Sequence, residues 1–190
     1  MAENSADFRH ETDRLILRDW REEDWAPFWE GTNTPSVSKW IGGVADAEAR
    51  TKTQKRLVQF AHDWGHTFWC VERRSDGAIL GFCGLKRCTD ENGPFGMMEA
   101  GWRLREDAWG KGYAKEAAIA TLDLSFDRFG ADETIAMTFQ SNGASWGLMR
   151  RLGMERRPEL DFKDEIWPQY EEPIIIHAIT KEQWSRLRER

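Results

Sequence analysis

The chain has 190 residues, of which 40% are hydrophobic and 32% are charged, and its formal net charge is −6. These values predict a globular protein that is long enough to bury a sizeable core. The negative charge argues against a nucleic-acid partner, and no apolar run approaches the length of about 20 residues that spans a membrane. The N-terminal segment lacks the pattern of a secretory signal, so we expect a cytoplasmic protein without a membrane partner.

The cysteines and tryptophans give weaker indications. The three cysteines are an odd number without a CxxC pair, which agrees with a reducing compartment and gives no reason to expect a metal site. The acidic balance gives weak support for a cationic ligand such as an amine. Eleven tryptophans are an excess, and four of them crowd the segment from Trp20 to Trp40. They are either large core residues or, together with Trp167 and Tyr170, an aromatic wall for a substrate.

The first 65 residues predict one strand followed by two helices. Alternating residues over 14–20 predict a strand, and an acidic start followed by apolar spacing over 21–31 predicts a short helix. A proline and a glycine pair predict a loop over 34–43. A charged helix is expected over 46–63, with Gly65 at its C-terminal cap.

The next segment, residues 67–88, predicts a β-hairpin, because two apolar runs flank Ser75-Asp76-Gly77, a turn sequence that allows a positive φ. Proline and charge leave residues 155–172 irregular, with a short strand after Gly153 left open. The other expected elements are a strand at 96–104, a helix ending near 130, a strand at 133–140, a helix at 142–154, a strand at 172–179 and a short helix from Thr180.

This order of elements predicts the α/β class, with one mixed sheet and helices on its faces. We expect residues 1–190 to form a single domain, with residues 1–10 and 181–190 as peripheral tails.

A glycine-rich segment, Trp109-Gly110-Lys111-Gly112-Tyr113-Ala114, leads from a strand into an alanine-rich helix. A loop without bulky side chains lets successive backbone N–H groups converge, and the helix start adds its unpaired donors and its dipole, which suits a phosphate. The spacing excludes a P-loop and a dinucleotide-binding fingerprint. A tight turn and a phosphate cradle both remain open at this point.

The context of this segment resembles a known family. "EAGWRLREDAWGKGYAKEA" is followed one strand later by "NGASWGLMRRLGM", and both are preceded by "ETDRLILRDWREEDW" and "GFCGL". This series closely resembles the GNAT superfamily of acyl-CoA-dependent N-acetyltransferases over roughly residues 11–180. It is most similar to the RimJ/RimL-like branch, named for enzymes that acetylate ribosomal-protein N-termini. Two departures from the superfamily are Trp109, where Arg or Gln is common, and the lack of a tyrosine on the helix at 142–154.

The resemblance implies a mostly antiparallel mixed sheet that splays between its fourth and fifth strands, with helices on both faces. It also implies acetyl-CoA as the acyl donor and no metal. Main-chain groups of Trp102 and Leu104 are expected to pair with the pantetheine arm. The other residues expected at the donor are Trp109, Gly110, Lys111, Gly112, Ala114, Lys115 and Asn142.

Two side chains are expected to carry proton transfers. Glu99, at the start of the fourth strand, is the candidate base that deprotonates the amine through water, or else a salt-bridged strand carboxylate. Ser145 matches the serine that this branch places near the CoA sulfur, and it is either the donor to the departing thiolate or an ordinary first-turn serine. His10 and His177 are left out of the mechanism.

The expected function is acetyl transfer from acetyl-CoA to a primary amine, either a small molecule or a protein N-terminus, by direct attack in a ternary complex. Two alternatives stay open: a catalytically silent acyl-CoA-binding module on the same fold, and an enzyme that uses a longer acyl-CoA. The acceptor is not identified by the sequence, and a homodimer remains an open expectation.

Overall fold

The structure is a computed structural model in which residues 8–163 and 169–189 are described. Its strands are β1 Arg9–Glu11, β2 Leu15–Arg18, β3 Phe68–Arg73, β4 Ile79–Arg87, β5 Met98–Leu104, β6 Glu133–Phe139, β7 Glu155–Arg156 and β8 Ile174–Thr180. Its α-helices are α1 Trp25–Thr32, α2 Pro35–Ser38, α3 Ala47–Trp64, α4 Tyr113–Asp127, α5 Gly143–Arg151 and α6 Lys181–Arg188. Single 3-10 turns are η1 Glu22–Asp24, η2 Glu106–Ala108 and η3 Pro158–Leu160.

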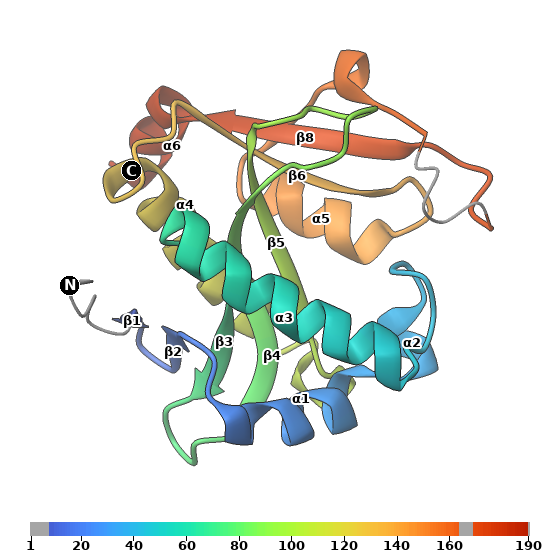
Figure 1. Cartoon of the computed structure of the whole chain (residues 1–190). Helices are drawn as coiled ribbons and strands as arrows, with labels where there is room; N and C mark the ends of the chain where they lie inside the picture. Colours follow the sequence, from blue (N-terminus) through green and yellow to red (C-terminus); the bar gives the residue numbers. More distant parts are fainter. Residues whose placement is uncertain (1–7, 164–168, 190) are drawn as a thin grey trace.

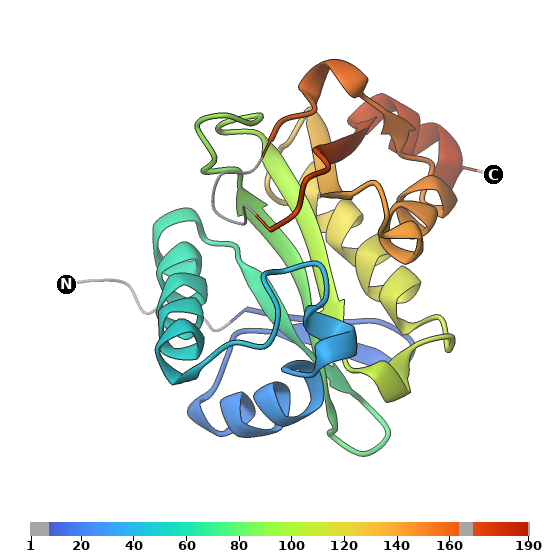
Figure 2. The same cartoon turned by 90° about the vertical axis from the view of Figure 1, so that its right-hand side faces the viewer.

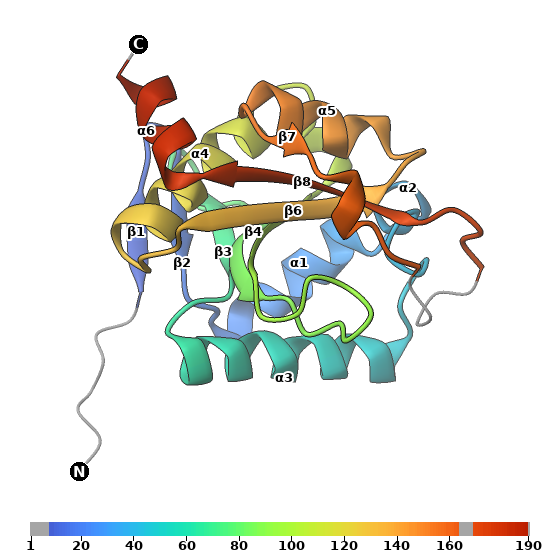
Figure 3. The same cartoon turned by 90° about the horizontal axis from the view of Figure 1, so that it is seen from above.

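The strands form one sheet in the order β1-β2-β3-β4-β5-β6-β8-β7. Neighbouring strands are antiparallel except for β5 and β6, which are parallel. Helix α3 lies on one face of the sheet, while α4 and α5 lie on the other (Figures 1 and 3). The predicted mixed, mostly antiparallel sheet with helices on both faces is therefore confirmed.

The central hairpin and the long charged helix form as predicted. The β3–β4 hairpin turns at Gly77, whose φ is +73°. Helix α3 begins at Asp46, whose side chain accepts from the N–H of Ala49, and ends at Gly65 with a φ of +70°. Polar capping at the start and left-handed glycine at the end satisfy helix termini locally, which is why sequence patterns locate them well.

One sequence expectation needs correction. Residues 34–43 are not all loop, because Thr34 accepts from the N–H of Val37 and Pro35 occupies the first turn of the short helix α2. Described residues near both ends of the chain pack against the rest of the fold. Phe8 is buried and its ring stacks on Trp69 at 4.1 Å, next to the edge strand β1. Trp184 of α6 is buried and donates to Asp123 at 2.8 Å.

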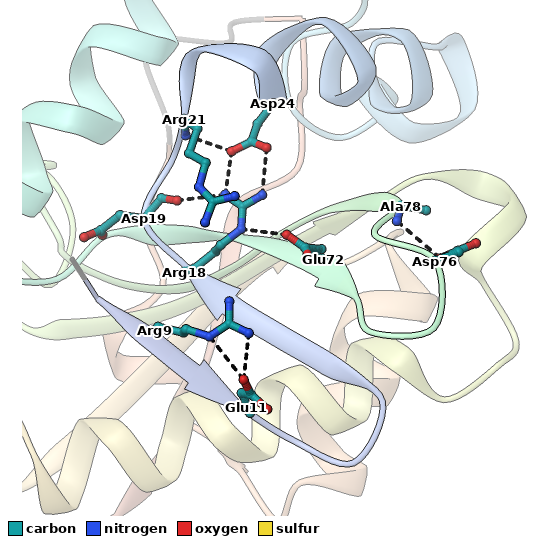
Figure 4. Close-up of polar contacts among 9 residues, drawn as sticks. All are labelled: Arg9, Glu11, Arg18, Asp19, Arg21, Asp24, Glu72, Asp76 and Ala78. Atoms are coloured by element: carbon teal, nitrogen blue, oxygen red, sulfur yellow. Dashed lines mark hydrogen bonds and ion pairs between the residues drawn. The ribbon is translucent and has the colours of Figure 1, made fainter.

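A buried ion pair fixes η1, and with it α1, on the sheet. Arg18 of β2 donates to both carboxylate oxygens of Asp24, at 2.6 and 2.8 Å, and through Nε to Glu72 of β3 at 2.7 Å (Figure 4). Burial by itself raises the pKa of Asp24, but the guanidinium of Arg18 and the N–H of Arg21 hold that pKa below its usual range. The Arg9–Glu11 pair in the same view is exposed.

The parallel pair opens after two residues. Met98 pairs with Thr134 and Glu99 with Ile135, and no further pair joins the described residues of β5 and β6. Figure 1 shows β6 and β8 running away from β5, with α5 and α2 at the opening. This is the splay that the family resemblance implies.

The two faces of β5 contact different helices. Met98, Ala100 and Leu104 belong to the core cluster that contains the apolar residues of α4. A Cβ on Gly101 would approach the ring of Phe68, which packs with α1, and Arg103 also lies over rings of α1. Successive residues of a strand project to opposite faces, so the end of β5 presents side chains to both.

Candidate active site

A cavity of about 740 Å³ occupies the opening of the sheet. Its walls come from four segments: α2 and the residues after it, the end of β5, the glycine-rich loop at the start of α4, and the start of α5. Figure 2 looks into this side of the molecule, with α2 in front of the end of β5. The residues expected at the donor that line the cavity are Trp102, Leu104, Trp109, Gly110, Gly112, Ala114, Lys115 and Asn142, and Ser145 lines it as well.

The glycine-rich loop requires glycine for its backbone conformation. Gly110 and Gly112 have φ values of +70° and +81°, and Gly112 is the N-cap of the 15-residue helix α4. A Cβ on Gly110 would meet no atom within 4 Å, so the space beside it is open. Lys111 lies between them, its carbonyl accepts from Arg14 at 2.9 Å, and its side chain does not line the cavity.

The backbone of β5 faces the opening at alternate residues. Arg105 donates its N–H to Leu80 of β4 at 2.8 Å, and ladder bonds alternate along an antiparallel strand. The N–H and C=O groups of Trp102 and Leu104 therefore point away from β4, toward the opening. The indole N–H of the exposed Trp109 donates to the carbonyl of Leu104 at 2.9 Å, so this carbonyl is already hydrogen-bonded. Trp109 also lines the cavity.

The start of α5 is capped by Asn142. Its side-chain oxygen accepts from the N–H of Ser145 at 3.4 Å, and its amide nitrogen donates to Thr138 at 2.8 Å. The side chain thus ties the start of α5 to the end of β6. Ser145 lines the cavity, and no hydrogen bond among the described residues uses its hydroxyl, so that donor is available.

Glu99 does not line the cavity. It is 6% exposed, and one carboxylate oxygen lies 2.9 Å from Nζ of Lys86 on β4. Between Glu99 and the cavity residue Arg103, the ring of Phe68 covers Gly101. The structure therefore does not bring Glu99 together with Ser145, and its assignment as a base stays a prediction.

The early tryptophans belong mostly to the core. Trp20 stacks on Trp25 at 4.1 Å, and Trp25 and Trp29 are buried against Phe28. Trp40 is the member of this group that lines the cavity, and it lies 6.3 Å from the ring of Tyr170. Of the four early tryptophans in the expected aromatic wall, Trp40 therefore remains. Trp167 lies outside the described residues.

Sequence patterns missed part of the cavity wall. The missed side chains come from α2 and the residues that follow it, from β5, and from α4 and α5: Val37, Lys39, Ile41, Arg103, Tyr113 and Arg151. The alternation of side chains along β5 was the only sequence signal for these residues, since it places Arg103 on the opposite face of the strand from Trp102. The lining includes four cationic side chains and, among the described residues, no carboxylate. The net charge of the chain thus does not predict the charge of its cavity.

Comparison with known proteins gives the class. A sequence model of the acetyltransferase (GNAT) domain matches residues 14–155, and the chain therefore belongs to the GNAT acetyltransferase family. It is similar to the Bacillus subtilis (strain 168) protein named as N-acetyltransferase YnaD, with 28% identity over 182 residues, covering 92% of this chain and 98% of that protein. The protein is thus an N-acetyltransferase of the GNAT type.

Solved structures agree with the fold. A GNAT-family acetyltransferase from Bacillus anthracis has a TM-score of 0.75 at 25% identity and covers 92% of this chain and 99% of its own. The acetyltransferase from Agrobacterium tumefaciens strain C58 has a TM-score of 0.78 at 23% identity, with 92% and 95% covered. The second likeness concerns the fold alone.

Among residues 8–163 and 169–189, no three His, Cys, Asp or Glu side chains are grouped as metal ligands. Within the same ranges, no helix combines the length and the apolar character that crossing a bilayer requires. The three cysteines are buried and free, and burial raises the pKa of the Cys83 thiol to about 12.

Proposed function

We propose that this GNAT-type enzyme transfers an acetyl group from acetyl-CoA to a primary amine, with both substrates bound in the opening between β5 and β6. The observation that carries the proposal is the cavity itself, which joins a glycine-rich loop at a helix start to an unused serine hydroxyl. Binding two reactants side by side removes much of the entropic barrier to their reaction.

The residues present fit an acyl-CoA. The loop at Gly110 and Gly112 has open space beside it and leads into the N-terminus of α4, where backbone donors favour a pyrophosphate. Lys115 and Arg151 add positive charge on the same side. The outward-facing backbone of Trp102 is available to a pantetheine arm in the manner of an added strand.

Acetyl-CoA supplies an activated thioester, and the chain supplies orientation and proton transfer. The nitrogen of the neutral amine forms a bond to the acetyl carbon while the carbon–sulfur bond breaks. The nitrogen loses one proton to water, and the CoA thiolate takes up one proton, so the products are the amide and the CoA thiol. The hydroxyl of Ser145 is the group that would donate to the departing thiolate, because it lines the cavity without another partner among the described residues. A backbone N–H near Trp102 is the candidate donor to the carbonyl oxygen as charge develops there.

The proposal extends to the RimJ/RimL-like branch of the family. Its support is Trp109 before the glycine loop and Ser145 in the first turns of α5, since both line the cavity. The acceptor class of that branch is not carried over.

The test is a thiol-release assay with acetyl-CoA and a panel of amines, combined with calorimetric titration of CoA. We expect CoA to bind and thiol release to depend on the acceptor. Binding without acceptor-dependent release would support the silent acyl-CoA-binding module instead, and a comparison of acetyl-, propionyl- and succinyl-CoA decides the acyl chain.

A further inference from the structure

The guanidinium of Arg103 lies at the cavity without a carboxylate partner among the described residues. Its Nη2 donates to the carbonyl of Thr32 at 2.7 Å and lies 3.4 Å from the hydroxyl of Ser38. Its Nε is buried and has no hydrogen-bond partner. A guanidinium has five N–H donors, so these contacts leave binding capacity unused.

Arg103 remains a cation at neutral pH. Burial lowers its pKa to about 10, and no neighbouring charge opposes that shift. The guanidinium lies over the rings of Phe28 and Trp29, at 5.4 and 5.3 Å from their centroids. These contacts hold the side chain in place but do not neutralise it. A partly buried charge without an anionic partner is costly, and an anionic ligand would offset that cost.

The side chain lies on the other face of the sheet from the glycine-rich loop. Leu104 packs toward α4, whereas Arg103, its neighbour on β5, contacts α1 and α2. The cavity therefore passes through the opening of the sheet, with the loop, Lys115 and Ser145 on one side. Because the N-terminus of α4 is the proposed site of the CoA phosphates, Arg103 is available to bind a different anion.

The half of the cavity around Arg103 has its own chemistry. Lys39 adds a second cation, with Nζ 4.7 Å from the centroid of the Trp40 ring, and Val37 and Trp40 supply an apolar wall. No carboxylate from the described residues lines this half or the other. A plain alkylamine, which arrives as an ammonium, would find two like charges here and no anion.

We propose that Arg103 binds a carboxylate of the acceptor, so that the acceptor is a small amine carrying a carboxylate, such as an amino acid with an apolar side chain. This rests on the proposed acetyltransferase function and names its substrate class. Arginine suits the role because its planar fork matches a carboxylate. The carboxylate takes no part in bond making: the amine acquires the acetyl group, the thiolate leaves, and the acid group only orients the amine.

Matched acceptors test this inference on the unmodified enzyme. L-Phenylalanine is compared with 2-phenylethylamine, which lacks the carboxylate. It is also compared with L-phenylalaninamide, which keeps the shape without the negative charge of the carboxylate. L-Leucine and 3-methylbutylamine form a second set. Thiol release gives kcat/KM, and calorimetric titration of the CoA complex gives affinity. We expect both acids to exceed their counterparts without a carboxylate by about 10- to 100-fold in both measures, the range of a charge-assisted hydrogen bond.

Variants locate the preference. Arg103→Met removes the charge at similar size, Arg103→Lys keeps the charge without the fork, and Arg87→Met, on β4 outside the cavity wall, is the matched control. We expect Arg103→Met to lower the acid-to-amine ratio to about one mainly through KM, with CoA affinity unchanged, and Arg103→Lys to retain part of the ratio. Because Arg103 also donates to the carbonyl at the C-terminus of α1, the folding of each variant is checked by circular dichroism. If Arg103→Met does not fold, the comparison of acids and amines on the unmodified enzyme decides the inference.

Three results would overturn the inference: equal use of acids and amines, failure of the acids to bind the CoA complex, or a preference that survives in folded Arg103→Met. Failure of the acetyltransferase proposal has a different signature: the chain does not bind CoA, or it binds CoA and releases thiol with none of the acceptors, whether acid, amide or plain amine.

Discussion

Arg14 and Glu116 join the turn between β1 and β2 to the first turns of α4, with Nε of Arg14 2.7 Å from Oε2 of Glu116. Nη1 of Arg14 also donates to the carbonyl of Lys111 at 2.9 Å. Burial alone raises the pKa of Glu116, but hydrogen bonds from Thr12 and Arg14 hold it below its usual range. At neutral pH the ionised carboxylate of Glu116 therefore holds the guanidinium of Arg14, which in turn holds the glycine-rich loop through the carbonyl of Lys111.

Substitution of Gly112 should abolish CoA binding. A Cβ there would lie 3.3 Å from Nη2 of Arg14, and a valine at a φ of +81° is strained by at least about 1–2 kcal/mol. We expect folded Gly112→Val to show no CoA binding by calorimetry. Gly130→Val is the control, since Gly130 has a φ of +62° with open space beside it outside the cavity wall. Unchanged CoA affinity in Gly112→Val would show that the loop does not hold the pyrophosphate.

Loss of the Ser145 hydroxyl should slow the reaction without abolishing it. A thiolate is a good leaving group, so we expect Ser145→Ala to reduce kcat by about tenfold, below the usual range for general acids, with CoA affinity unchanged. Ser141→Ala is the matched control, because its hydroxyl is engaged by Glu172 at 3.0 Å and does not line the cavity. Equal kcat values for the two variants would remove Ser145 from the mechanism.

The role of Glu99 can be separated from its ion pair. If Glu99 accepts the proton of the amine through water, Glu99→Gln should lower kcat about 100-fold at neutral pH. The loss should shrink at high pH, where more of the amine is already neutral. Lys86→Met breaks the same 2.9 Å pair and leaves the carboxylate. The same loss in both variants, independent of pH, would assign Glu99 a structural role.

The Arg18–Asp24 pair should dominate the response to acid. Asp24 has a lowered pKa in the folded protein, so its stabilisation is present above the unfolded-state pKa of about 3.9 and is lost as the pH falls through the folded-state pKa. Asp24→Asn leaves the buried charge of Arg18 partly uncompensated, and we expect it to cost about 3–5 kcal/mol at pH 7 in urea unfolding.

The same variant should flatten the fall in stability below about pH 4, because the titrating group is gone. Glu11→Gln, in the exposed pair with Arg9, serves as the control and should change the free energy of unfolding little (Figure 4). An acid response of Asp24→Asn as steep as that of the unmodified protein would contradict the assignment.

Local chemistry made much of the fold readable from the sequence. Gly65 and Gly77 need left-handed backbone, Asn142 and Thr180 cap helices through their own side chains, and apolar runs mark β3 and β4. The glycine-rich loop belongs to this group, because its signal is the backbone freedom of Gly110 and Gly112. These features depend on residues within a few positions of one another.

The sequence by itself determined the order of the elements and the loop at the start of α4, and its resemblance to a family implied the opening of the sheet. Only the tertiary structure decided what lines that opening. Glu99, which pairs with Lys86 on the neighbouring strand, is not part of the cavity wall, whereas Arg103 lies beside α2 at the cavity. Whether a side chain meets a partner of opposite charge depends on residues distant in the sequence, and that is decided by packing.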